Sequence, residues 1–136
     1  MASTLPTKIA GRDGTLLEVE AGGSITANTP TSGGKTTVSV GINIASATTT
    51  PVIAAQADYK IKVVGIILFS AGTNTVTLKR GTTALCGQFD LVAQSGFTMN
   101  IGENTPILET AANEAFNITT SAATQLSGVV VYFLEA

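Results

Sequence analysis

The stretch that decides the fold is KIKVVGIILFSAG, residues 60–72. A strand with one face on a core and the other in water alternates apolar and polar residues, because successive side chains point to opposite faces. Here the odd positions from 61 to 69 are apolar throughout, whereas the even positions change from lysine to apolar residues after Lys62. The segment is therefore predicted to be a strand whose second face is also covered along half of its length.

The same period of two recurs along the chain, between clusters of Gly, Asn, Ser and Thr. It predicts further strands over residues 15–20, 37–44, 75–80, 83–86, 89–92, 96–101 and 115–120. Short turn-forming segments at 70–75, 80–83 and 93–96 are typical of hairpins. This spacing indicates an all-β fold, an antiparallel β-sandwich, with at most one turn of helix at residues 111–115.

The first 35 residues differ in composition from the rest of the chain. Residues 22–35 are rich in Gly, Ser, Thr and Pro, and few of their side chains can be buried. Residues 1–35 are therefore predicted to form an extended N-terminal arm, and residues 36–136 the folded domain. Two alternatives remain for the arm, which are partial disorder on its own and ordering on a neighbouring subunit.

Composition excludes several classes of protein. The 136 residues fit one domain, and only 12% of them are charged, which is about half the usual share. The seven Lys and Arg are scattered, so the clustered cations that bind nucleic acid are missing. The apolar runs are shorter than the ~20 residues that span a bilayer, and the N-terminus lacks the apolar segment of a secretory signal. We therefore expect that the protein does not bind nucleic acid, does not associate with a membrane and is not secreted.

The sequence offers little catalytic chemistry. It contains no histidine, which removes the commonest general base and imidazole metal sites. Cys86 has no second cysteine to pair with and no histidine to activate it, so a buried inert thiol is expected. Glu18 and Glu20 share a strand face that we interpret as exposed and solubilising, and no calcium-loop pattern is present. The chain is predicted to be no enzyme and to hold no cofactor or metal.

The C-terminal segment LSGVVVYFLEA, residues 126–136, repeats the double apolar face of the opening stretch. If the two strands are neighbours, they form an apolar patch on the outside of the sandwich, which the arm or a symmetric partner must cover. The low charge favours the partner. The residues predicted to line the subunit interface are Val64, Ile66, Leu68, Val130, Tyr132 and Leu134. Those predicted to lie in the core are Ile61, Val63, Ile67, Phe69, Phe97, Phe116, Ile118, Val131 and Phe133.

Residues 50–136 resemble the small jelly-roll proteins of tailed bacteriophage virions. The resemblance is carried by PVIAAQADYKIKVVGIILFSAG, TVTLKRGTTALCG and ANEAFNITTSAATQLSGVVVYF. The last of these resembles a closing pair of strands, with a small-residue turn, an alternating strand, a Ser/Ala/Thr loop and an apolar final strand. Such proteins are similar in build to tumour-necrosis-factor-like jelly rolls, in which the sheet that contains the C-terminal strand packs about a threefold axis.

The resemblance implies a jelly roll that forms a homotrimer and serves as a non-enzymatic virion structural protein, made in the host cytoplasm. One version is a capsid decoration or cement protein, which binds the major capsid protein or another virion protein between capsomers and stabilises the phage head. The alternative is a trimeric tail-fibre or spike module that binds a host-surface glycan, although the chain lacks tryptophan. A third alternative is a stand-alone carbohydrate-binding or signalling jelly roll, against which the missing secretion signal counts.

Overall fold

The computed structural model describes residues 8–10, 16–18, 31–32, 35–102 and 105–136, with side chains from residue 35 onward. Within these ranges the chain forms strands, turns and loops, and no helix is present that has the length and apolar character to cross a membrane. Two short strand pairs come first, β1 (Lys8–Ala10) with β2 (Leu16–Glu18) and β3 (Thr31–Ser32) with β4 (Lys35–Thr36). The rest of the predicted arm lies outside the described residues.

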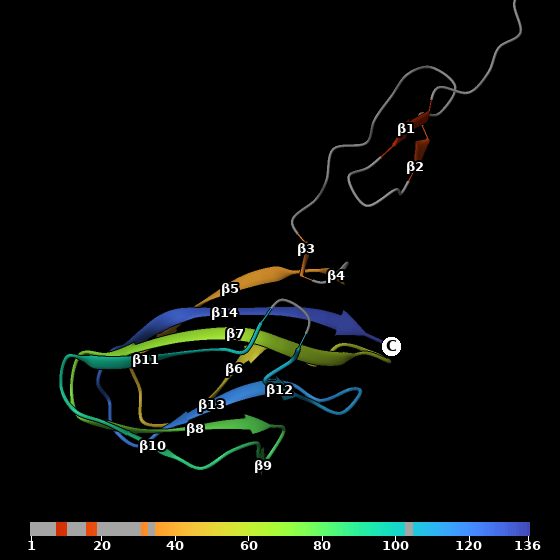
Figure 1. Ribbon diagram of the computed structural model, residues 1–136. Coiled ribbons are helices and arrows are strands. Elements are labelled where there is room, and N and C mark those ends of the chain that lie inside the picture. The colour runs from red at the N-terminus through yellow and green to blue at the C-terminus, as the bar shows by residue number, and fades with distance from the viewer. Residues whose placement is uncertain (1–7, 11–15, 19–30, 33–34, 103–104) are drawn as a thin grey trace, which may run out of the picture.

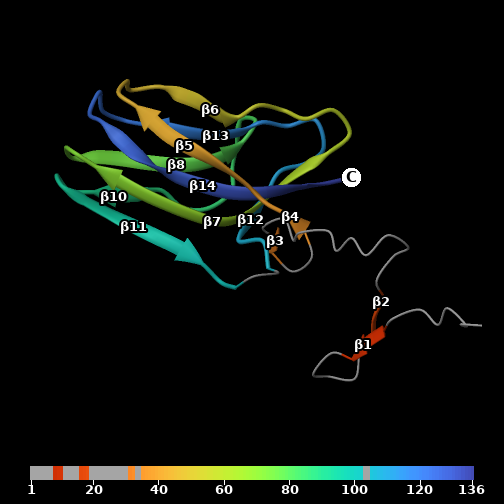
Figure 2. The same ribbon diagram turned by 90° about the horizontal axis from the view of Figure 1, so that it is seen from above.

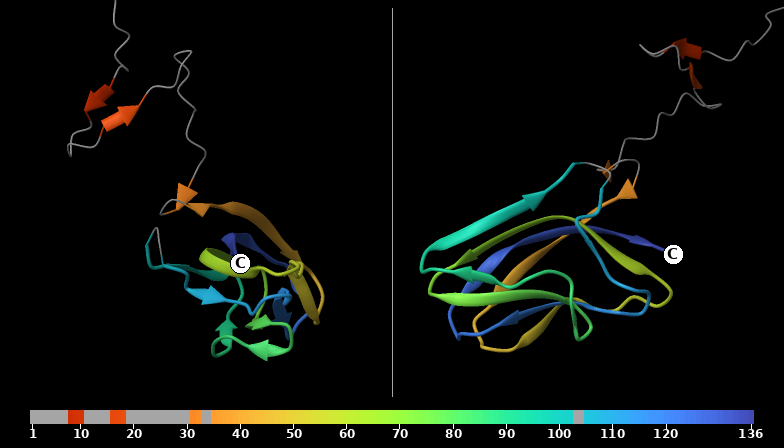
Figure 3. Two further views of the ribbon diagram at one scale, coloured as in Figure 1. Left: turned by 90° about the vertical axis from the view of Figure 1, so that its right-hand side faces the viewer. Right: turned by 60° about the horizontal axis from the view of Figure 1, so that its bottom comes forward.

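Two antiparallel sheets pack face to face and form a sandwich (Figure 1). The β7 sheet has the order β11 (Ser95–Asn100), β7 (Lys60–Ser70), β14 (Leu126–Glu135) and β5 (Val38–Ile44), with the short strand β12 (Leu108–Glu109) beside β7. The β8 sheet has the order β10 (Phe89–Leu91), β8 (Asn74–Arg80), β13 (Phe116–Thr120) and β6 (Thr49–Ile53), with β9 (Thr83–Ala84) beside β8. Figures 2 and 3 show the two layers from other sides.

The core lies between the two sheets and takes one face of each long strand. Its cluster of buried residues is Ile42, Ile44, Ile53, Ile61, Val63, Ile66, Leu68, Val76, Leu78, Leu91, Phe116, Ile118, Leu126 and Val130. The predicted core positions Ile61, Val63, Phe116 and Ile118 are confirmed, each fully buried, and Phe97 is half-buried against the cluster. The alternation was sufficient to place the inward face of β13 and that of β5 from Val40 onward, whereas Val38 at the start of β5 is exposed.

A β-bulge in β7 explains the double apolar face of the opening stretch. The pairing of β14 with β7 shifts register, so that Val131 faces Gly65 while the next residue, Tyr132, faces Val63. Val64 is the extra residue between them, and an extra residue reverses which parity points inward. Before the bulge the odd residues Ile61 and Val63 point into the core, and after it the even residues do.

The bulge corrects part of the predicted core. Ile67 and Phe69 were expected inside because they continue the odd parity of Ile61, but their side chains are 53% and 47% exposed. Val131, which faces Gly65 across the strands, is half-buried on the same outer side. Phe133 is 5% exposed but does not belong to the main core cluster. The prediction was wrong for Ile67, Phe69 and Val131 because it assumed one unbroken alternation along β7.

Two of the three predicted hairpins are connections between the sheets. The segment 70–75 joins β7 to β8, and the segment 93–96 joins β10 to β11, and in both cases the two strands belong to different sheets. The third, at 80–83, is a hairpin, in which Arg80 faces Thr83. Turn-forming residues alone do not distinguish a tight hairpin from a crossing between layers, because both need the same reversal of the backbone.

A buried asparagine holds the first crossing in place. The side chain of Asn74 is buried, and its Oδ1 accepts hydrogen bonds from the backbone N–H groups of Ser121 at 3.0 Å and Ala122 at 3.1 Å. Its Nδ2 donates to Thr124 Oγ1 at 3.2 Å. The start of β8 is thereby tied to the loop between β13 and β14, so that two loops far apart in sequence share one polar anchor.

Strand β6 was not predicted from the sequence. It contains Pro51, which has no N–H to donate and is tolerated only at the edge of a sheet. β6 is such an edge, since it pairs only with β13 among the described strands, and the pairing is irregular between Phe116 and Asn117. The run of threonines before Pro51 has no apolar alternation, so the sequence pattern did not indicate a strand there.

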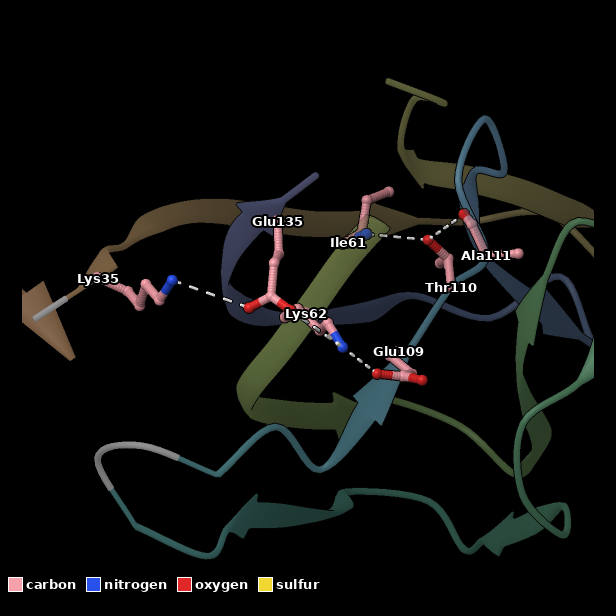
Figure 4. Close-up of polar contacts among 7 residues, drawn as sticks. All are labelled: Lys35, Ile61, Lys62, Glu109, Thr110, Ala111 and Glu135. Carbon is pink, nitrogen blue, oxygen red and sulfur yellow. Dashed lines mark hydrogen bonds and ion pairs between the residues drawn. The ribbon is translucent and has the colours of Figure 1, made fainter. Parts of the chain in front are cut away.

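The hydroxyl of Thr110 fixes the short strand β12 against the start of β7. Its side chain is 1% exposed, its Oγ1 accepts the N–H of Ile61 at 3.0 Å and donates to the carbonyl of Ala111 at 2.9 Å (Figure 4). Replacing Thr110 with valine keeps the shape and removes the acceptor of the Ile61 N–H, whereas the Ala111 carbonyl still accepts the N–H of Glu114. We therefore expect the unfolding free energy to fall by about 2 kcal/mol in urea titrations. The matched control is Thr98→Val at an exposed position of β11, where the change should stay within about 0.5 kcal/mol. Equal effects at both positions would contradict the role of the hydroxyl.

Candidate functional site: the outer apolar face

The most unusual surface of the described domain is a row of apolar side chains on the outside of the β7 sheet. We call Ile67, Phe69, Val129 and Val131 the outer apolar face. Ile67 and Val129 face each other across β7 and β14, and their side chains are 53% and 38% exposed. A contiguous exposed apolar row of this kind is typical of an interaction surface rather than of a wet sheet face.

The neighbouring strands frame this row with small and polar residues. On the β5 side Gly41 faces Val129 and Ser39 faces Val131, and on the β11 side Thr98 faces Ile67. None of these neighbours carries a charge, so a partner that covers the row desolvates no ionised group at its flanks. The surface is thus suited to burial against another apolar surface.

One end of the outer apolar face is closed by a set of ion pairs, which we call the charged end (Figure 4). The Lys62 ammonium forms an ion pair with the carboxylate of Glu109, and its Nζ lies 3.9 Å from Glu135 Oε1. The other carboxylate oxygen of Glu135, Oε2, lies 3.9 Å from Lys35 Nζ. The Lys35 ammonium also stands 5.9 Å from the ring centre of Phe133. The Lys62 side chain is only 12% exposed, so its charge is held mainly by the two carboxylates. The charged end limits how far an apolar partner can extend along the sheet.

The charged end changes the pKa of the Glu109 carboxyl group. The hydrogen bond from Lys62, and then the positive charge of Lys62, lower the pKa of Glu109 below its ordinary value of 4.5. A carboxyl group whose pKa is lowered by folding stabilises the fold above its unfolded pKa, and this stabilisation is lost as the pH falls through the folded pKa. The Glu109 side chain is 53% exposed, so solvent screens the pair and its contribution is small.

We therefore expect Glu109→Gln to lower the unfolding free energy by less than about 1 kcal/mol at neutral pH. The difference from wild type should shrink as the pH falls below about 4.5 and vanish below the folded pKa of Glu109. Urea titrations of both proteins at a series of pH values measure this difference in unfolding free energy. In a second variant, Lys62→Met, the pKa of Glu109 should be higher than in the wild type, which an NMR titration of the carboxyl groups measures. A difference that is constant over the whole pH range would contradict the ion pair.

The predicted interface residues occupy different places from those expected. Val64, Ile66, Leu68 and Val130 have at most 5% of their surface exposed within a single chain, and Tyr132 is half-buried against the core. Only Leu134, at 38%, is exposed. A side chain buried inside its own subunit has no surface left for a partner, so the face open to one is the outer apolar face. The existence of an apolar patch on two neighbouring strands was foreseen, whereas its parity was not, because no residue in the sequence marks the bulge.

The remaining chemistry-bearing residues do not converge. No group of three or more carboxylates or cysteines that can hold a metal ion occurs among residues 35–102 and 105–136. Cys86 is half-buried against the core, and burial raises the pKa of its thiol. Glu20 and Glu103 lie outside the described residues, as does the side chain of Glu18.

What the described surface can do chemically is bury apolar area against another surface. The outer apolar face lies on the outside of the sheet, and its neighbours Ser39, Gly41 and Thr98 are exposed. No protein-family model matches the chain, and no curated protein or solved structure is significantly similar to it.

Proposed function

We propose that this protein is a non-enzymatic structural component of a bacteriophage virion, a capsid decoration protein that associates as a homotrimer and binds between capsomers. The observation that carries the proposal is the outer apolar face on the sheet that contains the C-terminal strand β14. In the trimeric jelly rolls that the sequence resembles, the corresponding sheet packs about the threefold axis. Ile67, Phe69, Val129 and Val131 would meet their symmetry copies there.

We also propose that the sandwich is a jelly roll, and the strand order supports this. From β5 onward, and leaving aside the two-residue strands β9 and β12, the chain order of the strands is β5, β6, β7, β8, β10, β11, β13 and β14. Numbered one to eight, they form one sheet of order six-three-eight-one and another of order five-four-seven-two. One therefore pairs with eight, two with seven, three with six and four with five, as in a long hairpin wound into two layers.

The surface composition supports a protein that works within an assembly. Only 12% of the residues are charged, so the surface has little of the charge that keeps a soluble monomer apart from its copies. Burial of apolar area contributes about 25 cal/mol per Å², and each copy in a trimer contributes its own row to the shared interface. A decoration protein acts by this kind of burial, repeated over many subunits, and needs no catalytic group.

The test of self-association is the mass of the purified protein in solution, measured by light scattering after size exclusion. We expect a trimer for the wild type and loss of the trimer for Ile67→Asp, because the aspartate places a charge in the middle of the outer apolar face. The matched control is Ala84→Asp at an exposed position of β9 in the other sheet, which should remain trimeric. A wild-type protein that is monomeric at all concentrations would overturn the trimer.

The location in the virion needs a separate experiment. Antibodies against the protein, detected by gold labelling on virions released by the source organism, should decorate the heads. Label on the tails would favour the glycan-binding fibre instead, and binding of the purified trimer to host cells would support that outcome. Virions without any label would overturn the proposed function.

A further inference from the structure

The two sheets differ in how their edge strands are protected. An edge strand exposes unpaired N–H and C=O groups, and proteins usually protect it with proline, charge, a bulge or short length. In the β8 sheet, β6 carries Pro51 and an irregular pairing, and β10 has only three residues, one of them Asp90. In the β7 sheet, β5 and β11 contain no proline and no charged residue. Among the described strands, both edges that lack such protection therefore belong to the sheet that carries the outer apolar face.

Of these two edges, β5 is the better template for another strand. It has seven residues, VSVGINI, and four of them are β-branched, whereas β11 has six residues, SGFTMN, with one. Among the described strands β5 pairs only with β14, so its other edge has no strand partner there. Ser39, Gly41 and Asn43 are exposed on the outer side of the sheet. The chemistry of this edge fits an extended uncharged segment with the same alternation.

We propose that β5 pairs with β5 of a second copy, antiparallel, across a twofold axis at Gly41. A second copy is the occupant that the sequence of the strand fits, because the pattern VSVGINI reads with the same alternation in both directions from Gly41. In this register Val38 faces Ile44, Ser39 faces Asn43 and Val40 faces Ile42 of the other copy. Every β-branched side chain meets another on the core side, and the small polar residues meet on the outer side.

The interface is isologous and joins two sheets into one continuous sheet. It uses the edge of β5 and not the outer apolar face, so it does not rest on the proposed trimer. If both interfaces form, the edge contact links one trimer to the next, since each trimer presents three β5 edges. Pairing across this edge then gives a network of subunits in which backbone hydrogen bonds add to the apolar contacts.

Disulfide trapping tests the register in the full chain. In a Cys86→Ser background, Gly41→Cys places the two new thiols opposite each other. Opposed residues of antiparallel strands have Cα atoms about 4.5–5.5 Å apart, which suits a disulfide. Space is available, because a Cβ at Gly41 has no atom within 4 Å. We expect mild oxidation to convert most of this variant to covalent dimers on non-reducing gels.

Two matched variants control for accidental collisions. In Ser39→Cys or Asn43→Cys alone, the thiols lie four residues apart along the paired strands, roughly 14 Å, and should not cross-link. A mixture of these two variants should cross-link, because Ser39 faces Asn43 in the proposed register. Absence of the Gly41→Cys dimer, or equal cross-linking of all three single variants, would overturn the proposal.

The same experiment in an Ile67→Asp background separates this proposal from the proposed function. That substitution removes the trimer contact and leaves the β5 edge intact, so the Gly41→Cys cross-link should persist while the mass of the reduced protein falls. A cross-link that disappears together with the trimer would show that the contact depends on the outer apolar face, and the independent edge interface would be wrong. A trimer without the cross-link would retain the proposed function and reject the edge pairing.

Discussion

Replacing Val130 with aspartate is expected to remove much or all of the free energy that keeps the protein folded. Val130 has no exposed surface and lies in the core cluster, where it faces Ile66 across the sheet. A carboxylate there is removed from water without a partner, which costs about 4 kcal/mol or more. Small domains are stable by only about 5–15 kcal/mol, so this loss takes up much or all of the available stability. Urea titration followed by circular dichroism measures the change.

The adjacent residue gives the control. Val129 lies on the opposite side of the same strand and is 38% exposed, so Val129→Asp should leave the fold of the subunit within about 0.5 kcal/mol. Its effect should appear in the mass of the assembly instead. A folded Val130→Asp protein with reduced mass would show that the parity of β14 is opposite to the one described. The pair of variants therefore tests the bulge at Val64 as well as the outer apolar face.

Replacing Gly128 with alanine is the second change with a large expected effect. A Cβ at this position would overlap the carbonyl oxygen of Ile67, which is backbone and cannot rotate away. The two central strands β7 and β14 must then separate, and their shared ladder of hydrogen bonds is disturbed. We expect a loss of about 3 kcal/mol, the upper part of the usual range for overpacking, measured as a lower midpoint in thermal and urea unfolding.

Gly41→Ala is the matched control for this prediction. Gly41 lies on β5, the strand beside β14, and a Cβ there meets no atom within 4 Å. Alanine restricts the unfolded chain more than glycine does, so this variant should be equal to wild type or more stable by up to about 1 kcal/mol. Similar losses for Gly128→Ala and Gly41→Ala would contradict the close approach to Ile67 as the cause of the effect.

Much of the fold could be predicted because alternation has a clear physical cause. Where a strand has one dry and one wet face, as in residues 38–44 and 116–120, the period of two gave both the strand and its inward side. β7 is apolar on both parities beyond the bulge, so its pattern carried no information about which side faces the core. The position of Val64 as the unpaired residue depends on the partner strand, and no local pattern encodes it.

Connections between strands were harder to predict for a similar reason. The crossing at 70–75 depends on the buried side chain of Asn74. Its hydrogen-bond partners Ser121 and Ala122 lie 47 and 48 residues further along the sequence. A short polar residue in a turn is common in hairpins as well, so the local sequence favoured the simpler connection. For the candidate surface, the sequence predicted an apolar patch on two neighbouring strands. The exposed residues are the odd-numbered ones of β7 and β14, whereas the even-numbered ones were expected.

The bulge also divides β7 into two parts that differ in their lateral support. Residues 65–70 are paired on both sides, with β14 and with the six residues of β11. Residues 62–63 have β14 on one side and only the short β12 on the other. Residues 62–63 can therefore lose their neighbour on that side by opening of the two-residue strand β12, whereas residues 65–70 lose theirs only when the whole edge strand β11 is disrupted. Amide hydrogens on the two sides of Val64 accordingly belong to segments with different opening free energies, and the charged end lies in the less protected one.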